Sequence, residues 1–195
     1  MVYAFMKYYP AFLDLHGKRC CVIGGGSVAC RKARSLRAAG AAVTVIAPRL
    51  SRGMEVLAAK AEVRCIRQAY QSKYIRGSFL VIAATADPAV NSRVSSDAAR
   101  LKILSNIVDC PSKSDFIVPS VLHKQGLIIA VSTSGLAPSL SRQIRLDLRK
   151  KLVEKYTPAL RAIAKERRRL RGTSACFARR KHILARMARR ALRAP

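Results

Sequence analysis

The sequence predicts an α/β protein with a Rossmann-like parallel sheet, followed by a small α+β segment and a C-terminal helical region. Three observations lead to this prediction. A glycine-rich turn joins an apolar strand to a helix near residue 24, and apolar strands then alternate with helices up to residue 108. The tail is rich in alanine, leucine and arginine, which favour helix. We expect three parts, covering residues 1–112, 113–150 and 151–195.

The first element is a candidate dinucleotide turn. An apolar strand at 20–23 ends at three successive glycines, and Gly24, Gly26 and Ala29 fit the G-x-G-x-x-G/A spacing. Gly24 allows a tight turn, Gly26 lets the backbone approach a pyrophosphate, and Ala29 keeps the following helix close to the strand. With the strand at 43–46 the unit has the ~30 residues of a βαβ motif. Without that context, the same spacing would also fit a mere glycine-rich turn.

The acidic residue that usually binds the adenosine ribose is missing from this motif. It should stand about 20 residues after the turn, where the sequence has Pro48 and Arg49. Either backbone groups hold the ribose, or Arg49 meets a 2′-phosphate and the cofactor is NADP.

The alternation of strands and helices continues after this unit. We expect further strands at 61–66, 78–84 and 102–108 and helices at 51–59 and 88–100. The Asp87-Pro88 pair is typical of a helix start. Strands that alternate with helices predict a parallel sheet.

The pattern changes after residue 112. Two apolar segments, 116–122 and 127–132, flank a turn at Gln125-Gly126 and predict an antiparallel pair. A helix is expected from about 139 to 153, and the remainder after Thr157-Pro158 is also expected to be helical. Residues 172–174, Gly-Thr-Ser, should divide that remainder into two pieces.

Composition excludes several classes of protein. No apolar run approaches the ~20 residues that span a bilayer, and the N-terminus lacks the features of a secretory signal, so we expect a cytoplasmic protein without a membrane span. The six cysteines form no C-x-x-C pair, which predicts free thiols rather than a zinc site or disulfides. His16, His123 and His182 have no ligand spacing, so no metal site is expected.

The formal net charge of +28 is extreme, and residues 142–195 hold 19 lysines and arginines against three acidic residues. Such a field attracts nucleic acid, acidic lipid or a substrate with many carboxylates, although the same runs could be solvated helix faces. Phe177 is the only aromatic residue after Tyr156, which argues against nucleic acid. An NAD-sensing regulatory module that binds nucleic acid stays as the alternative, as does a tail that docks a partner or an anionic membrane.

A series of short motifs runs along the chain. In order they are Pro10-x-Phe-Leu-x-Leu, Gly24-Gly-Gly-Ser-Val-Ala-x-Arg-Lys32, Ala83-Ala-Thr-x-Asp87, Val90-Asn91, Asn106-Ile-Val-Asp109, Phe116-x-x-Pro-Ser120 and Ser132-Thr-Ser-Gly-x-Ala-Pro138. In these motifs and their order the sequence resembles the siroheme synthase N-terminal family, precorrin-2 dehydrogenase and sirohydrochlorin ferrochelatase, over about residues 8–150. The arginine density of the tail departs from that family.

The resemblance implies an activity and an assembly. Family members are oxidoreductases that convert precorrin-2 to sirohydrochlorin with NAD, and many are also lyases that insert ferrous iron, as a substrate, to give sirohaem. We therefore expect a dehydrogenase that also acts as a ferrochelatase, with dehydrogenase activity alone as the alternative. The resemblance also implies a homodimer, with an NAD-binding domain at 1–112, a dimerisation segment at 113–150 and a basic helical tail at 151–195.

The resemblance also implies the cofactor residues. Gly24, Gly25, Gly26, Ser27 and Val28 would hold the pyrophosphate, Pro48 and Arg49 would lie beside the adenosine ribose, and Thr85 would lie near the nicotinamide. Because the family uses NAD without an acidic residue at this strand end, NAD is preferred to NADP.

Asp109 is the candidate catalytic residue. It follows the fifth predicted strand, at the edge where an open α/β sheet places its ligand. It also matches the aspartate assigned as general base in the family. One carboxylate could accept the proton during dehydrogenation and the pyrrole protons during iron insertion. The alternative is that Asp109 merely caps a turn before Cys110-Pro111.

The substrate implied by the resemblance, precorrin-2, carries many carboxylates, and binding such a substrate would explain the positive charge of the chain. A basic cleft would attract and hold such a tetrapyrrole. The candidate substrate-binding residues are Lys113, Arg142 and Arg145, and further candidates are Arg31, Lys32 and Lys124. Arg142 and Arg145 are three residues apart on one predicted helix face.

Overall fold

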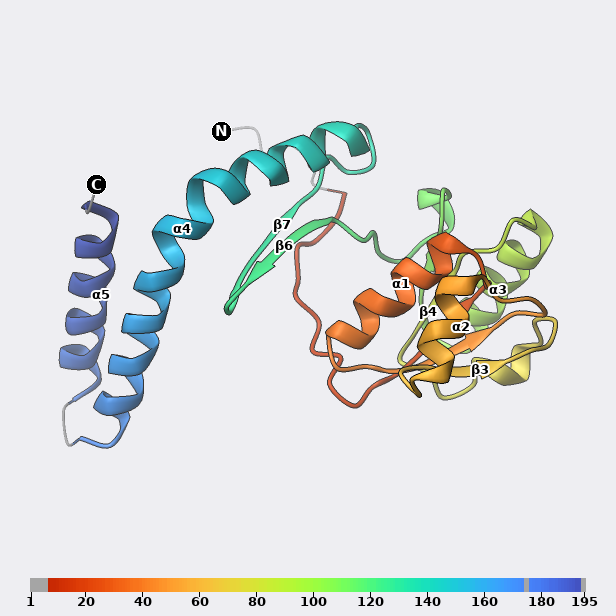
Figure 1. The fold of residues 1–195 in the computed structure, drawn as a ribbon, viewed down its shortest axis with the longest axis horizontal. Helices are drawn as coiled ribbons and strands as arrows, with labels where there is room; N and C mark the ends of the chain where they lie inside the picture. Colours follow the sequence, from red (N-terminus) through yellow and green to blue (C-terminus); the bar gives the residue numbers. More distant parts are fainter. Residues whose placement is uncertain (1–6, 174–175, 194–195) are drawn as a thin grey trace. The chain divides into compact units, whose positions relative to one another are not determined.

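The computed structural model describes residues 7–173 and 176–193. The chain divides into two compact units, with the boundary between Val118 and Pro119. The first unit holds the parallel sheet, and the second holds a β-hairpin and two helices (Figure 1). The functional roles expected for residues 1–112, 113–150 and 151–195 remain predictions.

The first unit contains a five-stranded sheet in the order β3-β2-β1-β4-β5. Its strands are β1 (Arg19–Ile23), β2 (Ala42–Ile46), β3 (Arg64–Ile66), β4 (Leu80–Ala83) and β5 (Leu104–Ile107). Every neighbouring pair is parallel, which confirms the predicted sheet. All of β4 is buried, as expected for a strand covered by helices on both faces.

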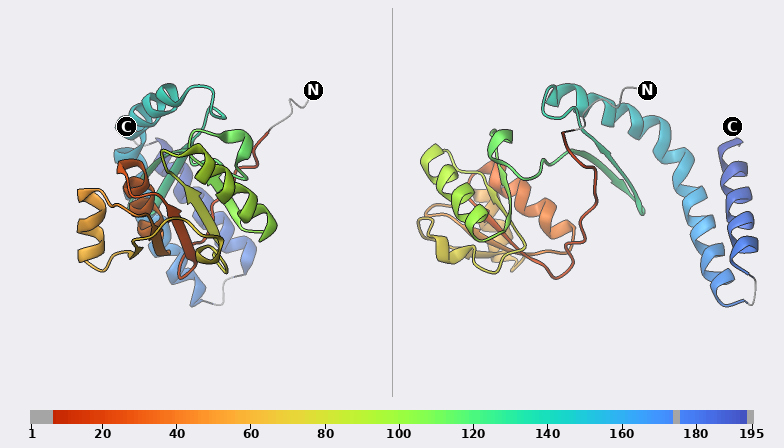
Figure 2. Two further views of the ribbon diagram at one scale, coloured as in Figure 1. Left: turned by 90° about the vertical axis from the view of Figure 1, so that its right-hand side faces the viewer. Right: turned by 180° about the vertical axis from the view of Figure 1, so that it is seen from behind.

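Helices cover the two faces of this sheet (Figure 2, left). They are α1 (Ser27–Ala38), α2 (Arg52–Ala59) and α3 (Pro88–Arg100), with short 3₁₀ turns η1 (Ser72–Tyr74) and η2 (Pro111–Lys113). One apolar cluster joins α1 and α2 to one face and includes Cys20, whereas the other joins α3 to the opposite face and includes Cys21. The two neighbouring cysteines therefore point to opposite faces, as strand geometry requires.

The helix at 88–100 starts as the sequence predicts. Asp87 is its N-cap, and its carboxylate accepts hydrogen bonds from the N–H groups of Ala89 and Val90 at 2.8 and 3.3 Å. Pro88 occupies the first turn, where its missing N–H has no cost.

Three strands of the sheet are shorter than predicted. Strand β4 spans Leu80–Ala83 rather than 78–84, and the other two begin late for a shared reason. Strand β3 begins at Arg64 rather than 61 and β5 at Leu104 rather than 102. Ala61 and Lys102, with φ of 52° and 54°, adopt the left-handed conformation that ends the preceding helix. The chain becomes extended only after that turn.

The second unit begins with a β-hairpin of β6 (Ser120–Lys124) and β7 (Leu127–Val131). The strands are antiparallel, as predicted, although β6 lies at 120–124 rather than at the predicted 116–122. Lys124 pairs with Leu127 across a two-residue turn. Gln125 and Gly126 both have positive φ, 51° and 89°, which is the type I′ geometry that matches strand twist.

The helical part of the second unit corrects one prediction. Helix α4 (Pro138–Arg171) does not end near residue 153 but continues through Pro158, and α5 (Phe177–Arg193) follows it. A proline inside a helix removes one backbone hydrogen bond and bends the helix, and the ribbon of α4 bends part-way along (Figure 1). Packing against the hairpin and against α5 outweighs that loss, because α4 contacts both.

Candidate active site

The order in which the chain adds strands to the sheet reverses between β1 and β4. From β1 the chain adds β2 and β3 on one side, and it then adds β4 and β5 on the other. In open α/β sheets, ligands bind at this switch point, outside the carboxyl ends of the strands. Gly24 follows β1 directly, and Ala84 and Thr85 follow β4. Gly24 has φ of 123°, and a side chain there would overlap the Ala84 carbonyl, so this close approach requires glycine.

The next two glycines have different surroundings. A Cβ atom at Gly25 would overlap the carbonyl oxygen of Arg49, whereas a Cβ atom at Gly26 would meet nothing within 4 Å. Gly26 is the N-cap of α1, and because it has no side chain it offers no capping hydrogen bond to the first N–H groups of the helix. The first N–H groups of a helix have no partner within it and are suited to bind phosphate. The open space at Gly26 therefore lies where a pyrophosphate would approach Ser27 and Val28.

The loop after β2 leans on the glycine turn. Ser51 donates its N–H to the Gly25 carbonyl at 2.8 Å, and the Arg49 backbone lies against Gly25. The side chains of Pro48 and Arg49 are exposed at this edge of the sheet. Their placement is compatible with the predicted ribose contact, which stays a prediction.

Thr85 is fixed by Asn91 of α3. The Asn91 Oδ1 atom accepts from Thr85 Oγ1 at 2.8 Å and from Thr85 N–H at 3.3 Å, and Asn91 Nδ2 donates to the Thr85 carbonyl at 3.1 Å. One amide side chain thus holds the strand end expected beside the nicotinamide. Sequence reasoning included Asn91 in a motif and assigned it no role.

Asp109 lies two residues beyond β5, with an exposed side chain and φ of 61°. Its neighbour Val108 packs on the cluster that contains Ala29 of α1, whereas Cys110, on its other side, packs on the cluster of the opposite face. Burial and the Arg31 charge lower the pKa of the half-buried Lys32, while the negative charge of Asp109 acts in the opposite direction. Asp109 and Lys32 are therefore electrostatic neighbours at the carboxyl edge, close to the start of α1.

The predicted substrate-binding residues have separate surroundings. Lys113 Nζ donates to Ser92 Oγ of α3 at 2.9 Å. In the second unit, Arg142 is exposed on α4, and Arg145 Nε donates to Ser120 Oγ of β6 at 3.0 Å. Two of the three side chains thus have protein partners, and substrate binding by all three stays a prediction.

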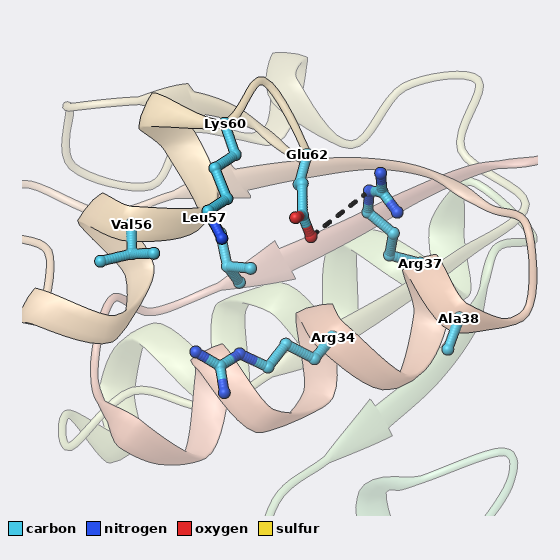
Figure 3. A pocket seen from close by; sticks show the side chains of 7 residues that line it. All are labelled: Arg34, Arg37, Ala38, Val56, Leu57, Lys60 and Glu62. Atoms are coloured by element: carbon cyan, nitrogen blue, oxygen red, sulfur yellow. Dashed lines mark ion pairs between the residues drawn. The ribbon is translucent and has the colours of Figure 1, made fainter.

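A cavity of about 310 Å³ lies between α1 and α2, away from these residues (Figure 3). It is lined by Arg34, Arg37, Ala38, Val56, Leu57, Lys60 and Glu62. Arg37 Nε lies 3.8 Å from Glu62 Oε2 across it. None of the predicted cofactor or catalytic residues lines this cavity, so we assign it no part in the candidate site.

The described residues contain neither a metal-binding cluster nor a membrane-spanning helix. Within 7–173 and 176–193, no three or more histidine, cysteine, aspartate or glutamate side chains group closely enough to hold a metal ion. No helix in that part of the chain has the length and apolar character needed to cross a membrane.

Residues 11–120 match the family model described as putative NAD(P)-binding. The chain belongs to this NAD(P)-binding family. Siroheme synthase of Nitrosococcus oceani is 40% identical over 151 residues, 77% of this chain and 32% of that protein. Siroheme synthase of Saccharophagus degradans is 38% identical over 164 residues, 84% of this chain and 36% of that protein. The chain spans about a third of the length of these curated relatives.

A solved structure is also similar to this NAD(P)-binding chain along most of its length. It is SirC, precorrin-2 dehydrogenase, with a TM-score of 0.78, 28% identity, and coverage of 92% of this chain and 89% of that one. Together with the relatives, it confirms the resemblance to the siroheme synthase N-terminal family.

Proposed function

We propose that this chain is a precorrin-2 dehydrogenase that uses NAD to form sirohydrochlorin in the cytoplasm. The observation that carries the proposal is the placement of Asp109 at the edge of the sheet that holds the glycine turn. The similarity to SirC, precorrin-2 dehydrogenase, over 92% of the chain supports the choice of substrate.

The residues of the first unit suit NAD. The N-terminus of α1 and the open space at Gly26 would receive the pyrophosphate, and Gly24, Gly25, Ser27 and Val28 would complete that contact. Pro48 and Arg49 would lie beside the ribose, and Thr85 would orient the nicotinamide. Bound NAD supplies an acceptor for a hydride.

Asp109 would supply the other half of the oxidation. Formation of one double bond in precorrin-2 releases a hydride, with its electron pair, and a proton. The hydride would go to bound NAD, and the exposed Asp109 carboxylate would accept the proton as general base. Lys113, Arg142 and Arg145 would hold substrate carboxylates by charge.

We also propose insertion of ferrous iron and a homodimer. The same carboxylate would accept the two pyrrole protons in turn as iron enters, passing the first to solvent before it accepts the second. The name siroheme synthase of the relatives supports this second step. The hairpin of the second unit exposes 46% of Val121 and 47% of Ile128, which supports burial of this face against a second copy.

The test is anaerobic incubation with precorrin-2 and either NAD or NADP, followed by absorbance as conjugation of the macrocycle grows, and then addition of ferrous iron. Asp109→Ala should abolish oxidation while NAD binding persists. Asp147→Ala is the matched control, since Asp147 is an exposed acid on α4 whose carboxylate accepts from Gln143. Full turnover by Asp109→Ala would remove Asp109 from the mechanism, and turnover with NADP alone would overturn the choice of cofactor.

A further inference from the structure

The segment after η2, rather than a further strand, closes the outer edge of β5. This strand ends the sheet, so the N–H groups of alternate residues point away from β4. Ser105 N–H donates to Asp115 Oδ2 at 2.8 Å, and Ile107 N–H donates to Ser114 Oγ at 2.9 Å. The chain returning after η2 therefore lies along β5. Asp115 N–H also donates to the Ser105 carbonyl, and Asn106 Nδ2 donates to the Phe116 carbonyl, both at 2.9 Å.

The Ser114 hydroxyl also forms hydrogen bonds to residues on both sides of Asp109. It accepts from Ile107 N–H and donates to the Cys110 carbonyl, also at 2.9 Å, with the Ile107 carbonyl farther away at 3.3 Å. One hydroxyl group thus fixes the residue two positions before Asp109 and the residue directly after it. Cys110 N–H closes the same turn by donating to the Ile107 carbonyl at 3.1 Å.

The backbone of Asp109 needs such support. Its φ of 61° lies in the left-handed region, which L-residues other than glycine adopt infrequently and which persists where the surroundings fix it. Other hydrogen bonds along this edge join Ser105 to Asp115 and Asn106 to Phe116, and neither pair includes a residue on each side of Asp109 within its turn.

We propose that Ser114 is a positioning residue, whose hydroxyl holds the Asp109 carboxylate in the orientation that removes the substrate proton. The proposal rests on the proposed function, because it acts through Asp109. Loss of the hydroxyl would let the turn relax and move the carboxylate, and displacements of about 1 Å can cost about 100-fold in rate.

The chain offers a matched pair of substitutions. Ser114 has φ of −116° and ψ of 134°, an extended conformation that suits the β-branched residues threonine and valine. These residues have nearly the same shape and differ in the hydroxyl. Ser114→Thr should keep turnover near that of the unchanged protein, whereas Ser114→Val should lower kcat by about 10- to 100-fold. KM for precorrin-2 and the affinity for NAD should stay within about twofold for both, because Ser114 is not expected to touch either molecule.

Two controls separate the possible failures. Ser112→Ala, in the same loop with an exposed side chain near Cys110 Sγ, should leave turnover unchanged. If Asp109→Ala is inactive while Ser114→Val turns over normally, the role of Ser114 is overturned and the proposed function stands. Normal turnover by Asp109→Ala overturns both. Equal losses for Ser114→Thr and Ser114→Val, with weaker NAD binding, would show that Ser114 serves packing and would overturn the positioning role.

Discussion

The sheet of the first unit and the hairpin of the second bury their strands to different extents. From Cys20 to Ile23, every residue of β1 is at most 2% exposed, whereas β7 has no buried residue and β6 buries only Leu122. Helices on both faces of the sheet give the first unit a core of its own. The hairpin of the second unit packs on α4 and leaves Val121 and Ile128 exposed.

The second unit is also the more basic of the two, with 20 lysines and arginines against three acidic residues in 119–195 and 18 against seven in 1–118. The residues of α5 include no acidic side chain, and its apolar residues Ile183, Leu184 and Met187 are only half-buried. The family match at 11–120 lies almost wholly in the first unit. Tight packing and the glycine turn thus occur in the same unit, while the second unit has a basic surface and half-buried apolar side chains.

The largest expected effect comes from the glycine turn of the first unit. Gly25→Ala would force the Arg49 carbonyl to move, so we expect loss of NAD binding and about 3 kcal/mol of stability. Gly26→Ala is the matched control: it has open space and ordinary φ, so stability should hold while a methyl group in the pyrophosphate space weakens NAD binding. Urea denaturation and NAD titration measure the two effects. Equal stability of the two variants would contradict the role of Gly25.

A second substitution pair compares the cores directly. Met54 of α2 is completely buried against the sheet, so Met54→Ala should cost about 2 kcal/mol of unfolding free energy. Ile183 on α5 is half-buried, and Ile183→Ala should cost about 1 kcal/mol. Circular dichroism during denaturation would measure both. A loss at Ile183 as large as that at Met54 would show that the second unit is packed as tightly as the first.

The smallest effect concerns the response of the first unit to alkali. Tyr70 is buried and donates to Asp97 Oδ2 at 2.9 Å; burial, and then this bond, raise the pKa of Tyr70 well above its ordinary value. Burial likewise raises the pKa of Cys20 to about 11. Tyrosine in the unfolded chain ionises at a lower pH than Tyr70 in the folded protein. The contribution of Tyr70 to the free energy of unfolding is therefore fully present below about pH 10 and decreases as the pH rises further.

Tyr70→Phe should therefore cost about 1 kcal/mol at pH 7, from the lost hydrogen bond. Above about pH 10 its stability should fall less steeply than that of the unchanged protein. Denaturant titrations at several pH values measure the slope. An unchanged slope would show that Tyr70 does not contribute to the alkaline response.

Those features of the first unit that depend on local sequence pattern could be predicted from the sequence. The glycine turn, the Asp87 cap and the order of strands and helices follow from short-range spacing, and the structure confirms them. Contacts made across the sheet edge, such as Ser114 with Ile107, could not be predicted, because no local signal shows which distant N–H group a serine will meet. Helix α4 continues through Pro158 for a similar reason, since packing against other elements outweighs the helix-breaking tendency of proline.

The two cysteines of β1 have a practical consequence. Both thiols are almost inaccessible, and burial raises the pKa of each, so at neutral pH they remain protonated and slow to react with alkylating reagents. Cys176, in the second unit, is exposed. The rate at which Cys20 and Cys21 are alkylated, followed by mass spectrometry, would thus report how often the sheet opens. The alkylation rate of Cys176 would serve as the internal standard for reagent access.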